Sequence, residues 1–323
     1  MLTICALLII PIISAFTVKH NFKVPFICEI HGIDVADVDI DTMDELKKLF
    51  HTTPVLVFKN QNITPKNQFE FSSQFDPYFT RDVVHPFMDT AIPERPQIAL
   101  RGKGHINNIF GVKDVTIRNS DAFKYTKVWH QDLVGTRGRF PTVVSSMYML
   151  QPSEEGGSTW FASMEKAYDN MMTYNCKLAP LQCCYSSQMA LNAKYDHSGY
   201  VRIDNNIQLD MRTLRKLYGD LEIQPLVIYP DGYSQRRSLL LSPNKFVGFV
   251  GMPPKASQEL MHRIMDNYVL AENNVDEVKY EKNDLVLFNN RKVIHSSSPI
   301  QGVVGNRILS LLFLNTREQL RSI

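Results

Sequence analysis

The segment KVWHQDLVG, residues 127–135, places an imidazole and a carboxylate between apolar neighbours. Alternate residues of a strand project to the same face, so we expect His130 and Asp132 to point into one space and Gln131 to point away from it. Two interpretations follow from this pattern. The segment is either a structural strand with one polar face, or it supplies two ligands of a divalent metal.

A third ligand and a cation stand further along the chain. His295 follows the apolar segment DLVLFNNRKVI (284–294), and Arg307 opens the apolar segment NRILSLLFL (306–314). Two histidines and a carboxylate form the facial triad of non-haem Fe(II) oxygenases, which leaves positions open for substrate and O₂. A buried arginine needs an anion, and a dicarboxylate cosubstrate can supply one. A structural histidine and a surface arginine remain the alternatives.

Composition excludes few function classes. The chain has 323 residues, 44% hydrophobic and 21% charged, with a formal net charge of +2. These values are typical of a globular protein with a sizeable core. We expect no nucleic-acid partner, because no basic block stands out.

The pattern along the chain favours a β-sheet core with helices packed outside it, an α+β protein. We expect a helix over 39–52, capped by Asp41 or Thr42, and a helix over 64–75 that begins at Thr64 and Pro65. Many short strands with turn signals from residue 128 onward predict a sandwich or barrel. The other expected elements are a strand at 54–63, an irregular stretch at 76–125 with a short strand at 98–100, a strand at 142–150, a helix near 163–173, a hairpin of 225–230 with 238–243, and a helix at 256–270.

The first 15 residues have the pattern of a signal peptide, because an apolar run is followed by the small residues Ser14 and Ala15, and the alternative is a buried N-terminal segment. This predicts secretion, with cytoplasmic and algal plastid locations as alternatives, and no stable membrane anchor. Residues 16–323 then form one domain, with a lid or insert around 175–222. Secretion would make Asn62 in the sequon NIT available for glycosylation.

Four cysteines would remain in the mature chain, namely Cys28, Cys176, Cys183 and Cys184. In an oxidising compartment Cys176 could pair with Cys183 or Cys184, and the alternative is that the cysteines are buried free thiols.

Several motifs together resemble the taurine dioxygenase-like (TauD/TfdA) family of Fe(II)/2-oxoglutarate-dependent dioxygenases, over roughly residues 26–317. They are EIHGIDVAD (29–37), LKKLFHTTPVLVFKNQNITPKNQFEFSSQF (46–75), WHQD (129–132), GGSTWFAS (156–163), NDLVLFNNRKVIHSSSP (283–299) and NRILSLLFL (306–314). The resemblance implies a double-stranded β-helix core (a jelly roll, cupin-like) with flanking helices. It also implies Fe(II) held by His130, Asp132 and His295, 2-oxoglutarate held by Arg307 and Thr159, and O₂ as the oxidant.

Two positions depart from the branch of that family that cleaves sulfonates. That branch has a second arginine four residues after the cosubstrate arginine, where this chain has Leu311. An aliphatic side chain cannot pair with a sulfonate, so we expect taurine to be a poor substrate. Thr126 occupies another substrate position of that branch. Arg101 and Lys103 could supply the missing cation, or they could be a solvated surface pair.

The expected reaction is hydroxylation or desaturation of a small organic substrate, with release of succinate and CO₂. Asp132 favours this over halogenation, because related halogenases need a residue there that does not bind the metal. The rival hypotheses are a catalytically silent β-barrel ligand-binding protein of the same fold and a cupin-type metal enzyme without 2-oxoglutarate. Members of the family form dimers or tetramers, so a homo-oligomer is also an expectation.

Overall fold

The structure is a computed structural model of the 323-residue chain. It describes residues 16–81, 85–117, 127–136, 139–186, 194–195, 201–202, 220–232 and 234–322. The predicted signal peptide and Thr126 lie outside these residues, so both stay predictions. Among the described residues, no helix is long and apolar enough to cross a membrane.

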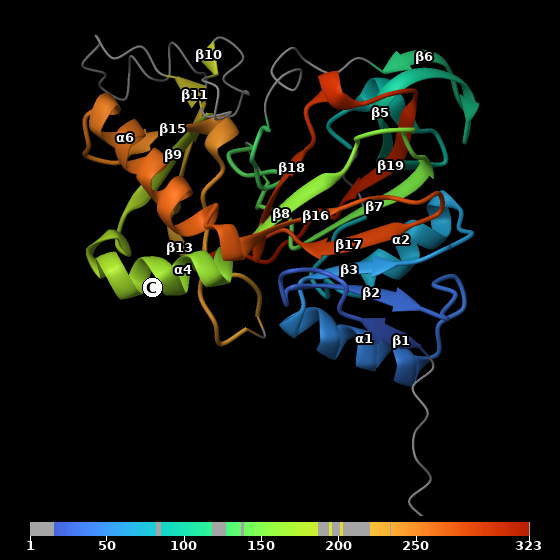
Figure 1. The fold of residues 1–323 in the computed structure, drawn as a ribbon, viewed down its shortest axis with the longest axis horizontal. Helices are drawn as coiled ribbons and strands as arrows, with labels where there is room; N and C mark the ends of the chain where they lie inside the picture. The colour runs from blue at the N-terminus through green and yellow to red at the C-terminus, as the bar shows by residue number, and fades with distance from the viewer. Residues whose placement is uncertain are drawn as a thin grey trace, which may run out of the picture.

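The larger of two facing sheets, called the major sheet here, contains nine described strands (Figure 1). Their order is β1-β2-β3-β17-β7-β19-β5-β4, with β6 paired to β5, and only β2 and β3 run parallel. The strands are β1 (Thr17–Lys19), β2 (Ile27–His31), β3 (Val55–Phe58), β4 (Ala91–Ile92), β5 (Arg95–Ile109), β6 (Val112–Ile117), β7 (Val144–Gln151), β17 (Leu285–Asn289) and β19 (Arg307–Phe313).

The second sheet, called the minor sheet, contains β16 (Val275–Val278), β8 (Thr159–Ser163) and β18 (Val293–Ser297) in that order. Its buried side chains pack against the inner face of the major sheet, where Phe161 of β8 meets Phe288 of β17. The two sheets form the predicted double-stranded β-helix core. The α+β class with flanking helices is therefore confirmed.

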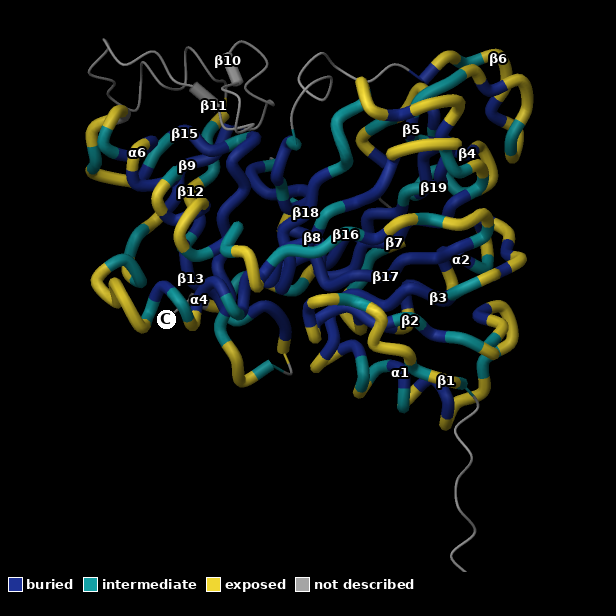
Figure 2. Tube along the Cα trace, in the orientation of Figure 1, coloured by how far each residue is buried: buried dark blue, intermediate teal, exposed yellow. Residues whose placement is uncertain are grey.

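The central strands of the major sheet are buried on both faces, which explains their nearly continuous apolar sequence (Figure 2). In β17, Val286 and Phe288 face the minor sheet, whereas Leu285 and Leu287 face the helices on the outside. This alternation is the period of two expected for a strand. A strand that is covered on both sides has no polar face, so apolar residues fill every position.

Two helices cover the outer face of the major sheet: α1 (Ile40–Thr52) and α2 (Pro65–Ser73). The predicted cap of the first helix was wrong by two residues, because Asp39 accepts the hydrogen bond from the backbone N–H of Thr42 at 2.7 Å. The start of the second helix agrees with the prediction, since Thr64 forms a capping box with Asn67.

The predicted irregular stretch at 76–125 was wrong in its central part. β5 runs over 15 residues and forms an antiparallel hairpin with β6. The prediction missed this strand because Gly102 and Gly104 interrupt its apolar pattern and because its hairpin end carries the exposed polar residues His105, Asn107 and Asn108. Both glycines have positive φ, which only glycine adopts without strain in an extended strand.

The remaining α-helices and most of the remaining strands form a third layer beside the jelly roll, on the left in Figure 1, around one apolar cluster. Its helices are α4 (Met164–Asn175) and α6 (Pro254–Ile264), and α6 continues into a π-helical turn, η4 (Met265–Val269). The strands are β9 (Gln182–Ser186), β12 (Leu221–Pro225) and β15 (Phe246–Phe249) in one sheet, β13 (Val227–Tyr229), β14 (Ser238–Leu239) and β20 (Arg321–Ser322) in another, and β10 (Lys194–Tyr195) with β11 (Val201–Arg202). The short 3-10 helices of the described residues are η2 (Cys176–Leu178), η3 (Pro243–Lys245), η5 (Glu272–Asn274), η1 (Met88–Thr90), which packs against β5 and β6 of the major sheet, and η6 (Ile300–Gly302), which links β18 to β19.

Several of the sequence predictions concern this layer. The hairpin of β13 with β14 agrees with the predicted pairing of 225–230 with 238–243. Most of the predicted lid or insert at 175–222 lies outside the described residues and stays a prediction, although β9 within it is a central strand. All four described cysteines are free thiols, so the disulfide alternative was wrong. Cys183 and Cys184 are buried in β9, whereas Cys176 is exposed.

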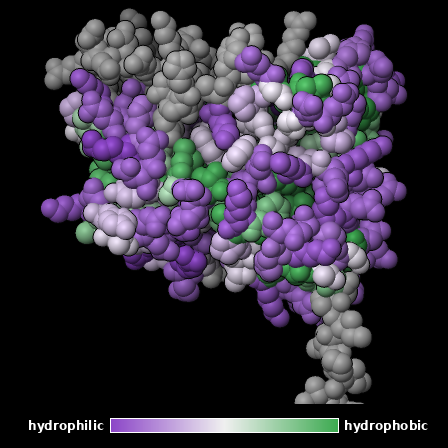
Figure 3. Space-filling view, viewed as in Figure 1, coloured by the Kyte–Doolittle hydropathy of each residue, from purple (hydrophilic) through white to green (hydrophobic). Residues whose placement is uncertain are grey.

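The surface formed by the described residues carries no feature that decides the oligomeric state. On the face in Figure 3, hydrophilic residues cover most of the described surface, and apolar residues show in patches between them. The most exposed large apolar side chains are Ile40, Tyr174 and Met88, which come from three separate elements or turns. The expected homo-oligomer therefore stays a prediction.

Candidate metal and cosubstrate site

The structure brings His130, Asp132 and His295 together at the rim of the jelly roll. One side-chain ligand atom from each of the three lies within 4.8 Å of the other two. Oδ1 of Asp132 is 3.7 Å from Nε2 of His130 and 3.7 Å from Nε2 of His295. The backbones of His130 and His295 join in an antiparallel bridge, with N···O distances of 2.9 and 3.0 Å, so the two rings lie side by side.

The expected strand around the WHQD motif is not present. His130 forms a single bridge, and a turn begins at Asp132, where Leu133 and Gly135 have positive φ. A Cβ atom at Gly135 would lie 2.6 Å from Cβ of Tyr185, so glycine is required there for packing as well as for backbone conformation. The motif still directs His130 and Asp132 to one side, but the local structure is a bridge and a turn.

Asn290 holds this turn in place, and sequence reasoning missed it. The side-chain oxygen of Asn290 accepts from the backbone N–H of Asp132 at 2.6 Å, and its amide nitrogen donates to the carbonyl oxygens of Asp132 and Thr142. Gln131, on the opposite side of the motif, donates to the carbonyl oxygen of Asn290 and accepts from the backbone N–H of Leu241. The start of the turn is therefore fixed by two buried amide side chains.

Each of two predicted ligands has a partner that orients it. Nδ1 of His130 is 2.8 Å from the carbonyl oxygen of Val128, and a proton on Nδ1 leaves the lone pair of Nε2 for a metal. Oδ2 of Asp132 accepts from the hydroxyl of Ser145 at 2.8 Å, which leaves Oδ1 toward the histidines. Nδ1 of His295 is buried without a hydrogen-bond partner among the described residues.

Burial sets the charges of the three side chains. It lowers the pKa of His130 and holds the pKa of His295 well below its usual value, so both rings are neutral at pH 7. Burial raises the pKa of Asp132 to about 7, and the hydroxyl of Ser145 and the ammonium of Lys245 oppose this shift. Two neutral imidazoles beside a buried carboxylate are a donor set that fits a divalent cation. The cation would also restore the negative charge of Asp132.

Arg307 and Thr159 lie on facing sheets and are connected through Tyr280. Arg307 opens β19, is only 8% exposed, and donates from Nε to the carbonyl oxygen of Gly157 at 2.6 Å. Its guanidinium carbon lies 5.4 Å from the ring centroid of Tyr280, and the hydroxyl of Tyr280 donates to Oγ1 of Thr159 at 2.8 Å. Sequence reasoning found the first and last members of this row and missed the tyrosine.

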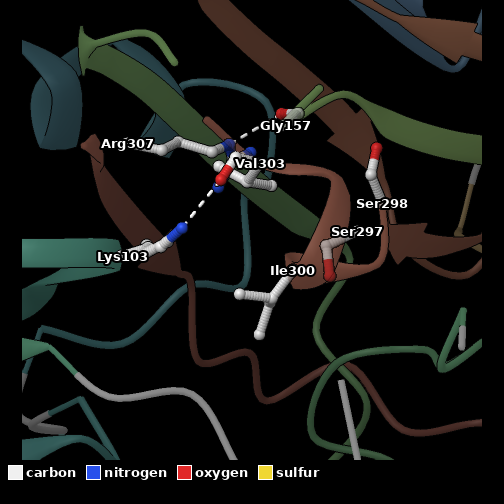
Figure 4. Close-up of a pocket in the computed structure, with 8 residues that line it drawn as sticks. Lys103, Gly157, Ser297, Ser298, Ile300, Val303 and Arg307 are labelled. Carbon is white, nitrogen blue, oxygen red and sulfur yellow. Dashed lines mark hydrogen bonds between the residues drawn. The ribbon is translucent and has the colours of Figure 1, made fainter. Parts of the chain in front are cut away.

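A pocket opens beside Arg307, as Figure 4 shows. Ser297 lines it and stands two residues after His295 on β18, so the pocket adjoins the predicted metal group. The complete lining is Gly102, Lys103, Gly157, Ser297, Ser298, Ile300, Val303 and Arg307. A dicarboxylate that bridges the metal group and Arg307 would occupy this region.

Gly157 leaves the space that Arg307 needs. The residue has a φ of +74°, and a Cβ atom there would lie 2.8 Å from Cδ and 3.1 Å from Nε of Arg307. Contacts below 3.0 Å are not tolerated, so a side chain at this position would displace the arginine. The GGST sequence thus serves the arginine through its glycine as well as the predicted Thr159.

The structure describes Leu311, Arg101 and Lys103, the residues discussed above as possible substrate contacts. Leu311 lies on β19, half-buried in the apolar cluster of the inner face, four residues after Arg307. Arg101 and Lys103 are not a solvated pair. The guanidinium of Arg101 lies 3.8 Å from the ring centroid of Phe87, and Lys103 lines the pocket of Arg307.

The His–Asp–His group fits the class of non-haem Fe(II) oxygenases, and the buried arginine beside it fits a dicarboxylate cosubstrate such as 2-oxoglutarate. Comparison with known proteins agrees with this class. The sequence model of the family described as "Taurine catabolism dioxygenase TauD, TfdA family" matches residues 20–311. The chain therefore belongs to the TauD/TfdA family.

Curated relatives are similar over most of their length. The alpha-ketoglutarate-dependent xanthine dioxygenase xanA of Emericella nidulans is 23% identical, over 82% of this chain and 87% of the relative. The (S)-phenoxypropionate/alpha-ketoglutarate-dioxygenase of Sphingobium herbicidovorans is 27% identical, over 83% of this chain and 84% of the relative. The protein is accordingly a 2-oxoglutarate-dependent dioxygenase, an enzyme that uses Fe(II), 2-oxoglutarate and O₂.

Solved structures show the same fold. A taurine dioxygenase from Burkholderia xenovorans superimposes with a TM-score of 0.69 at 17% identity, over 96% of this chain and 95% of that protein. AAD-2, solved in complex with Mn(II) and N-oxalylglycine, gives a TM-score of 0.65 at 17% identity, over 95% of this chain and 99% of that protein. These similarities support the jelly-roll core.

Proposed function

We propose that the enzyme hydroxylates a small organic substrate while it converts 2-oxoglutarate and O₂ to succinate and CO₂. His130, Asp132 and His295 hold Fe(II), and Arg307 and Thr159 hold the distal carboxylate of 2-oxoglutarate. The main support is that ligand atoms of the three side chains, from distant parts of the chain, lie within 4.8 Å of one another. One oxygen atom of O₂ enters the substrate as hydroxyl, and the other enters succinate.

The chain's own residues have binding and orienting roles in this reaction. Bound iron supplies the oxidising chemistry. The carbonyl oxygen of Val128 and the hydroxyl of Ser145 fix the orientation of two ligands, which limits the geometries that the site can adopt. Arg307 supplies a planar pair of donors for a carboxylate, and burial on the inner face of β19 excludes water from that contact.

Leu311 supports a substrate other than taurine. It lies on the strand that carries Arg307, within an apolar cluster that includes Leu309 and Met147. A sulfonate buried against these side chains would lack a cation, which is costly. The names of relatives mention xanthine, phenoxypropionate and sulfonate, so the family's substrates are chemically diverse. A screen of candidate metabolites for stimulated turnover of 2-oxoglutarate would identify the substrate class.

The experiment that tests the proposal measures Fe(II)-dependent release of succinate together with metal binding. We expect the wild type to bind Mn(II), used in place of Fe(II), and the double variant His130→Ala/Asp132→Ala to lose this binding. His105→Ala is the matched control, because His105 is an exposed imidazole on β5. Equal binding of Mn(II) and 2-oxoglutarate by the wild type and the double variant would contradict the proposal and favour a silent ligand-binding protein.

A further inference from the structure

Lys103 and Arg307 face each other across two neighbouring strands. They are register partners in the antiparallel pair of β5 with β19, and both line the pocket in Figure 4. The glycines on either side of Lys103 allow the strands to approach. A Cβ atom at Gly102 would collide with the carbonyl oxygen of Arg307, and one at Gly104 would lie 2.6 Å from the side-chain oxygen of Asn306. The backbone is thus shaped to bring these two cations to one pocket.

Two cations in register repel each other unless an anion lies between them. Within the described part of the chain, no carboxylate oxygen lies within 4.0 Å of the ammonium of Lys103 or the guanidinium of Arg307. Each cation instead donates to a backbone carbonyl, Lys103 to Val303 at 2.7 Å and Arg307 to Gly157 at 2.6 Å. These bonds fix the positions of the cations but do not neutralise them.

We propose that Lys103 is a second cation for the distal carboxylate of 2-oxoglutarate, which it and Arg307 hold from two strands. This inference rests on the proposed function. The arginine would meet the carboxylate with its terminal amino groups, while the ammonium would approach from β5. Because the pair carries two positive charges, a cosubstrate with a distal carboxylate binds much more tightly than one without it. Lys103 is then a cosubstrate contact, and it does not take an anionic group of the substrate.

The test compares two ligands that differ only at the distal end. The Mn(II)-loaded enzyme is titrated without O₂ by calorimetry, with 2-oxoglutarate and with 2-oxopentanoate, which has a methyl group in place of the distal carboxylate. We expect Lys103→Met to weaken the binding of 2-oxoglutarate about tenfold and to leave the affinity for 2-oxopentanoate unchanged. Lys113→Met is the matched control, since Lys113 is exposed on the adjacent strand β6, and it should change neither affinity.

The outcomes separate this inference from the proposed function. If Lys103→Met lost the same affinity for both ligands, Lys103 would have a structural role through its bond to Val303. An unchanged affinity for 2-oxoglutarate would refute the contact of Lys103 with the distal carboxylate. Lys103→Gln provides the same comparison if the methionine variant does not fold. Arg307→Met is the reference. If wild type and Arg307→Met bind 2-oxoglutarate equally, the proposed cosubstrate site itself is wrong, whereas sensitivity to Arg307 alone refutes only the role of Lys103.

Discussion

Gly157→Ala should weaken 2-oxoglutarate binding without touching the metal ligands. The added methyl group would lie 2.8 Å from Cδ and 3.1 Å from Nε of Arg307, and it would also meet Oγ of Ser153. The serine hydroxyl ends a short side chain that can rotate away. The arginine is buried and fixed by its bond to the carbonyl oxygen of Gly157, so it must move or the backbone of residues 156–158 must deform.

The expected magnitude has two parts. A left-handed φ of +74° costs an alanine about 1–2 kcal/mol of stability, because its Cβ approaches the following carbonyl. Displacement of Arg307 removes charge-assisted hydrogen bonds to the carboxylate, worth about 1.5–3 kcal/mol. The second part corresponds to a roughly ten- to hundredfold weaker affinity for 2-oxoglutarate.

Gly32→Ala separates the two parts. Gly32 has a φ of +81°, and a Cβ atom there would meet nothing within 4 Å, so this variant has the backbone strain without the collision. Thermal unfolding should show a loss of stability in both variants, on the order of a few °C for Gly32→Ala and larger for Gly157→Ala, which adds the collision to the strain. Calorimetric titration of the Mn(II)-loaded proteins should show weakened 2-oxoglutarate binding only in Gly157→Ala. Unchanged affinity in Gly157→Ala would refute the argument that glycine makes room for the arginine.

Three further predictions concern the metal site, the effect of pH and a helix cap. Ser145→Ala removes the hydrogen bond to Asp132, so the affinity for Mn(II) at pH 7 should fall about tenfold. An unchanged affinity would mean that water replaces the hydroxyl. Burial lowers the pKa of His85 to about 3 in the folded protein. The contribution of the neutral His85 to the free energy of unfolding is therefore complete above pH 6.5 and decreases as the pH falls toward 3, by about 1.4 kcal/mol per pH unit. Urea unfolding between pH 7 and 5 should show that the free energy of unfolding decreases less for His85→Phe than for the wild type. An equal decrease in both proteins would contradict this prediction. Thr64→Ala should cost about 1 kcal/mol of unfolding free energy, whereas Thr64→Ser should retain most of it.

The sequence predicted that His130, Asp132 and His295 lie together, but it predicted their local structure less well. The rule that alternate residues of a strand point the same way placed His130 and Asp132 on one side correctly, although the segment is a bridge and a turn. The prediction succeeded because a residue and its second neighbour also point the same way in extended backbone outside a sheet. It failed on the element because the turn is imposed by Asn290, which lies far along the chain and leaves no trace near the motif.

The segment NNRK (289–292) shows why partners of this kind escape sequence reasoning. It has the composition of an exposed turn, yet Arg291 and Lys292 are both at most 1% exposed. Arg291 donates to the carbonyl oxygens of Pro141, Pro230 and Glu318. Lys292 donates to the carbonyl oxygen of His51. Polarity indicates exposure only when no acceptor is near, and the acceptors here come from distant segments.

Those buried cations bear on how the site is assembled. The chain leaves the major sheet at Asn289 and enters the minor sheet at Val293, so the three residues between them set the position of His295 relative to Asp132. Arg291 and Lys292 fix this crossing to the surrounding backbone, and Asn290 within it holds the turn of Asp132. One short crossing therefore positions two of the three proposed ligands. A substitution there should alter metal affinity without contact to the metal, because it moves His295 and Asp132 together.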